Sequence, residues 1–419
     1  MSMPRVFCFA RAAQRGTTSA RGALRDIPFD FFKLDNTMKR HALIGCVLGA
    51  FALGAHASSD SSVTLFGIID QGLLYSSNQG GAHALQMVSG TTAPTKWGLR
   101  GVEDLGGGNK ALFMLSSTFS ANNGTAWPSG RVFGDYAWLG LSNDHLGTVK
   151  LGRQSDSMIA YLGDFSAVGS WGGTFFAHPF DNDNLWDSFL LNNAVRYESV
   201  SFGGFDFGAT YAFSNKASAT SGSGSGFADN RVWEAAARYR MGPFSTALVY
   251  EQIDHPGDDA PGAFGAVDAA DANFAASGQR IYGIGMGYSF QRVDLHANVT
   301  RTTLSEPTGE YQSTNFSGAS SMSFDNVEVN VVYHVTPVFS LEGAYMYTTA
   351  KVDGSAPHWN QAGLVAEYAL SRRTSVYAQG VYQRVTGDGS PFAHAQINTL
   401  SPASGNTQSV AGIGLRHFF

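Results

Sequence analysis

The sequence predicts an all-β fold, a closed antiparallel transmembrane barrel of sixteen strands. From Ser62 onward hydrophobic and polar residues alternate with a period of two, in segments of about nine to fourteen residues, which is the pattern of strands. Fifty glycines and only two cysteines suit a large sheet with many turns. Short and long connections alternate between the segments, as they do in a barrel with turns at one end and loops at the other.

The sixteen segments follow one another along the whole mature chain. In the first of them, Val63, Leu65, Ile69 and Leu73 share one face, so that face is apolar. The segments are centred near residues 69, 98, 115, 137, 151, 197, 208, 236, 248, 285, 298, 329, 344, 364, 379 and 414.

The connections predict which end of the barrel carries the termini. Seven connections are tight turns, at 105–109, 143–147, 201–204, 241–243, 291–292, 336–337 and 371–373. Eight are longer and polar, near 77–92, 121–130, 156–192, 215–229, 255–278, 305–322, 352–357 and 387–408. Both termini therefore lie at the short-turn end. A bilayer tolerates only a closed sheet, and sixteen strands enclose a lumen wide enough to hold water.

Aromatic residues near the strand ends predict two girdles at the membrane interfaces. The candidates are Tyr75, Trp138, Tyr239, Tyr250, Tyr345, Tyr347, Tyr368, Tyr377 and Tyr382.

A secretory signal peptide is predicted at residues 38–57. Lys39 and Arg40 form its basic head, residues 42–55 its apolar middle, and Ala55-His56-Ala57 its small-residue cleavage site. The chain is therefore expected to be exported through the periplasm.

Cleavage between Ala57 and Ser58 leaves a mature domain of residues 58–419. Residues 1–37 would make the signal internal, so we interpret them as a non-native or untranslated extension, with a long signal head or a transit peptide as the alternative. Eight of the 27 Lys and Arg and three of the 33 Asp and Glu precede Ser58, so the mature chain keeps 19 and 30 and has a net charge of −11. An acidic chain of this kind is a poor nucleic-acid binder.

Several motifs of the mature chain resemble those of the Gram-negative trimeric general porins, with similarity from Ser61 to Phe419. They are SVTLFG at 62–67, KWGLRGVEDLGGG at 96–108, GTVKLGRQ at 147–154, NNAVRY at 192–197, SFGG at 201–204 and LRHFF at 415–419. The resemblance implies a homotrimer in the outer membrane, in contact with its lipids and lipopolysaccharide, that lets ions and small hydrophilic solutes diffuse passively through a water-filled pore.

The last strand looks like an outer-membrane assembly signal. Leu415 and His417 lie on the same face as the terminal aromatic residue Phe419. We expect the barrel-assembly machinery to bind this strand.

The resemblance also implies that the third loop folds into the lumen and narrows it. This loop carries five acids and no Lys or Arg: Asp156, Asp164, Asp181, Asp183 and Asp187. The family's facing basic wall falls on Lys96, Arg153 and Arg196, with Arg100 nearby in a less certain orientation. The alternatives are a solvated acidic surface loop and, for the basic residues, ordinary ion pairs that anchor the loop.

Two positions depart from the family pattern. Asp135 stands where several relatives have Arg, and Ser116 stands where Glu is common. With the charge of −11, Asp135 predicts a pore that is weakly cation-selective, because rings of fixed charge set ion preference.

Other functions are less well supported by the sequence. The nine mature histidines are scattered, and no metal-ligand spacing or nucleophile motif is present, so we expect no enzyme, no cofactor and no metal. A calcium site at Asp254, Asp258 and Asp259 stays open. A secreted β-sandwich adhesin would not need sixteen segments or a terminal aromatic residue.

A substrate-selective channel of the same fold is the nearest alternative. The third loop is rich in aromatic residues, which either pack it to the wall or form a stacking surface for solutes; wall packing is the favoured interpretation. These residues are Trp171, Phe175, Phe176, Phe180 and Trp186.

Overall fold

The computed structural model describes residues 61–128, 130–215, 229–257, 265–269, 271–311, 314–315, 317–352, 354–387 and 392–419. Every described residue belongs to one compact unit, residues 55–419. The predicted extension 1–37, the signal peptide 38–57 and the cleavage site at Ala57 and Ser58 lie outside the described residues.

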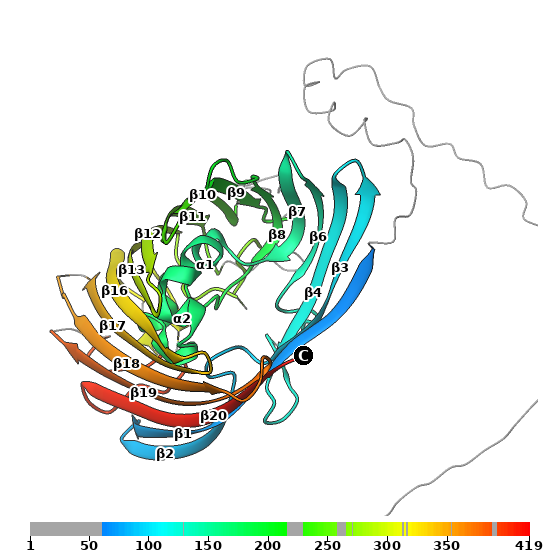
Figure 1. Cartoon of the computed structure of the whole chain (residues 1–419). Coiled ribbons are helices and arrows are strands. Elements are labelled where there is room, and N and C mark those ends of the chain that lie inside the picture. Colours follow the sequence, from blue (N-terminus) through cyan, green and yellow to red (C-terminus); the bar gives the residue numbers. More distant parts are fainter. Residues whose placement is uncertain are drawn as a thin grey trace, which may run out of the picture. The chain divides into compact units, whose positions relative to one another are not determined.

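Sixteen long strands form one closed antiparallel barrel in which neighbours in the chain are neighbours in the sheet (Figure 1). They are β1 (Ser62–Gln79), β3 (Lys96–Gly106), β4 (Asn109–Phe119), β6 (Ala137–Asn143), β7 (Gly147–Gln154), β8 (Leu191–Glu198), β9 (Phe205–Ala212), β10 (Arg231–Met241), β11 (Phe244–Asp254), β12 (Gly278–Ser289), β13 (Val293–Ser305), β16 (Ser321–Thr336), β17 (Phe339–Val352), β18 (His358–Ala369), β19 (Thr374–Thr386) and β20 (Thr407–Phe418). Each predicted segment centre falls inside its strand, which confirms the fold class.

Short strands extend the long-loop end of the barrel. β2 (Ala82–Ser89) folds back on the end of β1, and β5 (Ala126–Trp127) pairs with β4. β14 (Glu310–Tyr311) and β15 (Thr314–Asn315) form a separate two-stranded ribbon.

The barrel closes between its first and last strands. On one side β1 pairs with β3 over Ser62–Ile68 and with β2 over Gln71–Gln79, and on the other side it pairs with β20 over Ile68–Ser76. The terminal residue takes part: Phe419 donates its amide to the Gly67 carbonyl at 3.0 Å and accepts the Gly67 amide at 3.1 Å. Each strand of the barrel thus has a paired neighbour on both sides in the described residues, and unpaired edges are what a sheet must avoid.

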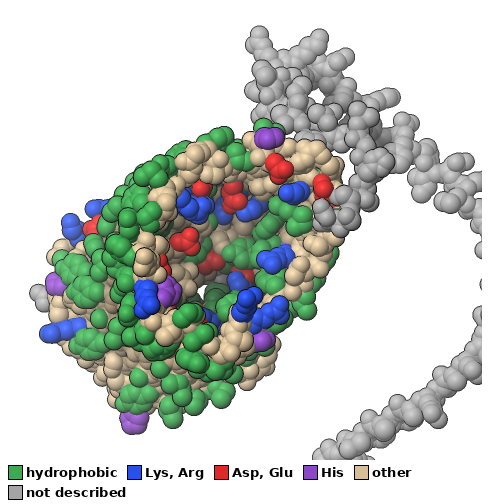
Figure 2. All heavy atoms as spheres, viewed as in Figure 1, with side chains coloured by type: hydrophobic (Ala, Val, Ile, Leu, Met, Phe, Trp, Pro, Cys, Tyr) green, Lys and Arg blue, Asp and Glu red, His purple; other side chains and the backbone are tan. Residues whose placement is uncertain are grey.

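The outer face of the barrel is apolar and the inner face is polar. In β1, Val63 and Leu65 are 67% and 56% exposed on the outside, whereas Asp70 is fully buried inside. Figure 2 shows the hydrophobic outer surface and charged side chains gathered along the hollow. No helix among the described residues is long and apolar enough to cross a membrane.

Two predicted girdle residues face the wrong way. Trp138 lies in the same phase of β6 as the buried Gly140, and its ring lies under Lys150. Tyr75, Tyr345 and Tyr368 are exposed on the outer face, as expected. Tyr377 lies in the opposite phase of β19 and points inward, where it is buried and donates a hydrogen bond to Asp70 at 2.5 Å. The predictions for Trp138 and Tyr377 were wrong because proximity to a strand end does not fix which face a residue occupies.

The third loop, residues 155–190 between β7 and β8, folds into the barrel (Figure 1). It consists of two short helices and three 3₁₀ turns: α1 (Ser157–Leu162), η1 (Gly163–Phe165), α2 (Ala167–Ser170), η2 (Thr174–Phe176) and η3 (Pro179–Asp181). α1 contacts β9, β10, β11 and β12. The loop is therefore part of the interior, not a solvated surface loop.

Apolar side chains fix the loop to the wall. Met158, Leu162 and Phe176 are fully buried in one cluster with residues that face inward from β11, β12, β17, β18 and β19. Two wall glycines make room for them, since a Cβ added at Gly283 would lie 2.2 Å from Leu162 and one at Gly363 would lie 2.4 Å from Phe176. Four of the five predicted loop aromatics are buried, which favours wall packing over a stacking surface.

A second cluster joins three loops at the long-loop end. Phe180 of the third loop packs within 6.3 Å, ring centroid to centroid, of Phe324 and Trp359 on the wall and of Phe392 in the eighth loop. Phe274 of the fifth loop, residues 255–277, packs on Phe324. At the long-loop end of the barrel, the fifth and eighth loops therefore pack in one cluster with the third loop.

We expect Gly363→Ala to loosen the third loop. The added methyl group has no space beside Phe176, and overpacking of this kind costs about 1–3 kcal/mol. The midpoint of heat-dependent electrophoretic mobility of the refolded protein should fall and protease cleavage within residues 155–190 should rise. Gly380→Ala on the next strand, whose nearest contact would be 3.7 Å away, serves as the control. Equal behaviour of the two variants would contradict this packing model.

Candidate functional site

The wall holds the third loop through the backbone of the loop. Asn298 and Asn330 both donate a side-chain amide to the Phe165 carbonyl at 3.0 Å, and the Thr302 hydroxyl donates to the Asn182 carbonyl at 2.8 Å. Further donors are Gln361, to the carbonyls of Phe175 and Ala177, and Asn398, to that of Thr174. These bonds satisfy carbonyls that short helices and turns leave unpaired.

The loop leaves one side of the lumen open. Its contacts run along the wall from β9 to β19 and reach Gly90 and Thr91 before β3, and the space-filling view shows a hollow past the loop (Figure 2). Ala160, Asp164, Gly169 and Ser170 are exposed on the loop. We therefore expect this exposed edge of the loop and the wall opposite it to limit passage.

Lys96 and Asp135 form an ion pair on the wall. Lys96 Nζ lies 3.1 Å from Asp135 Oδ2, which also accepts the Ser116 hydroxyl at 2.8 Å. Arg100 lies four residues further along β3 on the same face, is exposed, and stacks over the Phe66 ring at 5.7 Å. Asp135 and Ser116, the two positions that depart from the family pattern, are therefore bonded to each other, and Asp135 neutralises Lys96.

Arg153 does not face open water. The β7–β8 register shifts between Gly152 and Gln154, and Gly152 has φ +129°, so this bulge turns the Arg153 side chain inward. Its guanidinium bonds both carboxylate oxygens of Asp271 in the fifth loop, at 2.7 and 3.0 Å, and Asn192 Oδ1 at 2.6 Å. It is 8% exposed and anchors the fifth loop to the wall.

Asp271 is shared between two arginines. Arg131 also bonds it, at 2.6 Å. Burial favours the neutral carboxyl, but the two guanidinium groups outweigh it and hold the pKa of Asp271 below its ordinary value. The ionised Asp271 carboxylate therefore joins the fifth loop to Arg131 of the second loop and to Arg153, next to the start of the third loop.

Arg196 is also an internal anchor. It is 4% exposed and donates to the Ser155 carbonyl at 2.6 Å and to the Thr210 hydroxyl at 2.9 Å, with Glu234 at 3.5 Å. Arg153 and Arg196 therefore anchor loops, which was the alternative to a basic wall facing the acidic loop across water.

The five loop acids divide into two groups. Asp164 is exposed and Asp187 is half-buried, accepting the Ser155 hydroxyl at 2.8 Å. Asp156, Asp181 and Asp183 are fully buried and do not face Lys96 or the arginines across water.

Backbone geometry explains the buried acids. Asp156 caps the first turn of α1 by accepting the Ile159 amide at 3.0 Å, and Asp181 accepts the Trp186 amide at 3.0 Å. Between residues 180 and 187 four non-glycine residues have positive φ, and these tight turns direct the Trp186 amide to a side chain instead of a backbone carbonyl. The carboxylates supply the missing acceptors.

His178 is a buried residue that sequence reasoning did not single out. Its Nδ1 lies 2.7 Å from Asp183 and its Nε2 lies 3.4 Å from Glu328 on β16. Burial lowers the pKa of His178, but Asp183 and Glu328 outweigh this and raise it to about 10. The only signal in the sequence is that His178 is the single basic side chain of the loop.

Two loop acids titrate near neutrality. Burial, with the nearby charge of Asp135, raises the pKa of Asp187 to about 7, although Ser155, Lys96 and Arg153 act in the opposite direction. Burial, with the charge of Asp183, raises the pKa of Asp181 to about 7 as well.

An apolar exterior, a closed sheet and a loop-narrowed polar lumen define a channel across the outer membrane. The chain belongs to the Gram-negative porin family, whose model matches residues 42–389. Porins are channels and not enzymes.

Known relatives agree with this assignment. The chain is 30% identical to an outer membrane porin protein of Bordetella pertussis, over 91% of this chain and 100% of that protein. It is 27% identical to outer membrane porin protein 32 of Delftia acidovorans, over 89% of this chain and 98% of that protein.

Solved structures share the fold. An anion-selective porin from Comamonas acidovorans matches with a TM-score of 0.67 and 24% identity, over 86% of this chain and 100% of that chain. OmpT of Vibrio cholerae matches with a TM-score of 0.59 and 14% identity, over 87% of this chain and 100% of that chain.

We expect Asp271→Asn to destabilise the barrel strongly. It leaves the buried Arg153 guanidinium without its carboxylate, and an uncompensated buried charge costs about 3–5 kcal/mol. Urea unfolding in lipid vesicles measures the loss. Asp325→Asn, which breaks the half-exposed pair with Arg301, should cost no more than about 1 kcal/mol. A small effect of Asp271→Asn would show that Arg153 finds another partner.

The ion preference should depend on pH through Asp187. Because its folded pKa is about 7, the carboxyl is neutral at about pH 5.5 and ionised at about pH 8.5, so rising pH adds negative charge beside Lys96. The reversal potential in a KCl gradient should move toward cation preference over this range. Asp187→Asn should flatten the change, whereas Asp181→Asn, at an enclosed site, should preserve most of it. A pH response unaffected by Asp187→Asn would contradict the assignment.

Proposed function

We propose that this porin is a general channel for passive diffusion of ions and small hydrophilic solutes, with a weak preference for cations. The observation that carries the proposal is the open hollow past the third loop, with polar and charged side chains along it (Figure 2). Such a passage selects mainly by size and polarity.

The weak cation preference rests on which charges remain free. Lys96 is neutralised by Asp135, and Arg153 and Arg196 are held in buried bonds. The acids that remain on the loop are Asp164, which is exposed, and Asp187, which is half-buried, and the exposed base on the wall is Arg100. The Comamonas acidovorans porin is anion-selective by its title, so this chain would differ from a protein of the same fold.

Burial of the loop aromatics supports a general channel over a substrate-selective one. Trp171, Phe175, Phe176 and Phe180 are at most 8% exposed and pack on the wall. They therefore offer no stacking surface to a sugar or an aromatic acid.

The proposed assembly is a homotrimer in the outer membrane, in contact with lipid and lipopolysaccharide. One solved structure of Vibrio cholerae OmpT is described as a trimer form. The outer face of β20 supports recognition by the assembly machinery, because Leu415, His417 and Phe419 are exposed on it and the strand closes the barrel.

Single-channel recording of the refolded mature chain tests the proposal. In a planar bilayer with a KCl gradient we expect large conductance steps in groups of three and a small reversal potential that favours potassium. Arg100→Gln should increase the preference for potassium, because it removes the exposed positive charge. Block by one solute class at low concentration would instead indicate a substrate-selective channel, and a preference for chloride would overturn the assignment of the free charges.

A further inference from the structure

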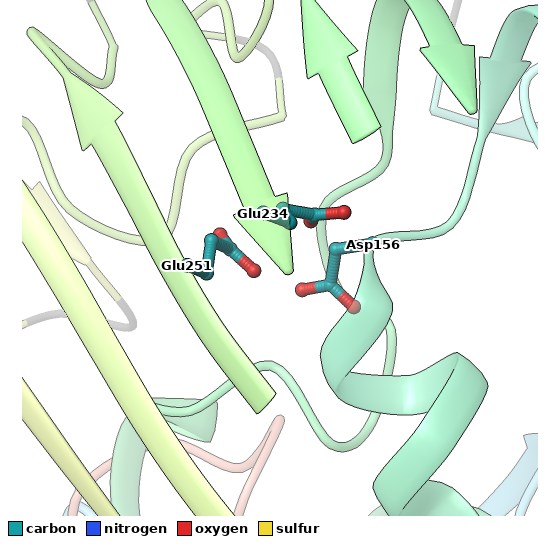
Figure 3. Close-up of side chains that lie close together, drawn as sticks. All are labelled: Asp156, Glu234 and Glu251. Carbon is teal, nitrogen blue, oxygen red and sulfur yellow. The ribbon is translucent and has the colours of Figure 1, made fainter. Parts of the chain in front are cut away.

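Three carboxylates from separate elements converge between the third loop and the wall. Asp156 precedes α1, Glu234 lies on β10 and Glu251 lies on β11, and Figure 3 shows their side chains pointing toward one another. One oxygen from each lies within 4.8 Å of the others, and all three side chains are at most 2% exposed. Like charges at this spacing repel strongly when water is excluded.

Glu251 distinguishes this cluster from an ordinary acidic patch. Neither of its carboxylate oxygens has a hydrogen-bond partner among the described residues, although the side chain is fully buried. A buried carboxylate without a donor is costly, and such groups are paired or bind a metal. The unpartnered oxygens therefore indicate a missing ligand at the centre of the cluster.

The neighbouring groups do not supply the missing charge. Glu234 accepts the Ser157 amide and hydroxyl at 3.1 and 2.6 Å, and Asp156 accepts the amide of Asn184 at 2.8 Å, but all of these donors are neutral. Arg196, at 3.5 Å from Glu234, is the one cation bonded to the cluster in the described part of the chain. Three ionised carboxylates and one guanidinium leave two negative charges.

We propose that Asp156, Glu234 and Glu251 bind one divalent cation, of which calcium fits best, and that this ion clamps the start of the third loop to β10 and β11. Carboxylate oxygens are the hard ligands that calcium and magnesium prefer. Calcium binds oxygen at about 2.3–2.6 Å in a flexible shell, so ligand oxygens up to about 5 Å apart share one ion. Magnesium demands shorter, near-octahedral contacts and keeps several waters, for which an enclosed site has less room.

The clamp gives the cluster a role in the channel. Asp156 begins α1, so an ion held there joins the first turn of the restricting loop to two wall strands beside the cluster that holds Leu162. Burial and the charges of Glu234 and Asp187 raise the pKa of Asp156 well above its ordinary value in the absence of an ion. A bound cation offsets the repulsion between the buried carboxylates and keeps the loop in place, whichever solutes pass.

Calcium binding by protein refolded without lipopolysaccharide tests the site directly. After treatment with EDTA and dialysis, isothermal titration with calcium chloride should show one saturable site per chain, and bound terbium should give luminescence that calcium abolishes. Glu251→Gln should weaken binding at least tenfold. Asp164→Asn, which removes an exposed acid of the same loop, should leave it unchanged.

A second measurement separates a metal clamp from a purely structural cluster. Calcium should protect residues 155–190 of the wild-type protein from protease, and Glu251→Gln should stay as sensitive as the EDTA-treated wild type. If Glu251→Gln does not fold, as judged by heat-dependent mobility, Glu251→Asp is used in its place. The aspartate side chain is one methylene shorter, so its carboxylate lies further from the proposed ion. Absence of saturable calcium binding by the wild type, or equal binding by the Glu251 and Asp164 variants, would overturn the proposal and leave protons as the neutralising species.

Discussion

The structure depends on pairing of the backbone around a closed sheet. A membrane offers no water to an unpaired amide or carbonyl, so each strand of the wall must find both neighbours. β1 meets this requirement by pairing with β3 and β2 on one side and with β20 on the other, and the last residue of the chain, Phe419, completes the seam with Gly67. Once the seam is formed the wall is closed, and the loops of the interior can pack on it.

The interior is assembled from loops rather than from a core of its own. The third loop packs its apolar residues on wall glycines, and the fifth loop is tied to the wall through Asp271 and Arg153. The basic residues therefore hold loops in place, and the water-exposed surface of the restriction carries few free charges. Arg153 would be assigned to solute selection if the lumen were described only as opposed charges across water. In this structure it also stabilises the fold, because it holds the fifth loop to the wall.

Much of the fold could be predicted from the sequence, because a period of two and alternating connection lengths are local signals. All sixteen strand centres and the infolded third loop are confirmed. The orientation of Arg153 could not be predicted, since it depends on a bulge at Gly152 and on an acid 118 residues away. Nor could the burial of Asp156, Asp181 and Asp183, which follows from backbone turns specific to this loop.

The two buried acidic clusters could not be predicted from the sequence for a similar reason. His178, Asp183 and Glu328 meet from the loop and β16, and Asp156, Glu234 and Glu251 meet from the loop and two other strands. Each set brings loop residues together with strand residues much further along the chain, at a spacing that no motif records. Only the three-dimensional arrangement shows that one set contains a histidine and the other does not.

The amide side chains that grip the third loop have an evolutionary consequence. Asn298, Asn330 and Gln361 recognise carbonyls, which every amino acid possesses, and not the side chains of the loop. Residues on its exposed edge, such as Ala160, Asp164 and Ser170, are therefore free to be exchanged without loss of position. A lineage can retune what its envelope admits by point mutation at these sites, while the architecture that displays them is inherited intact.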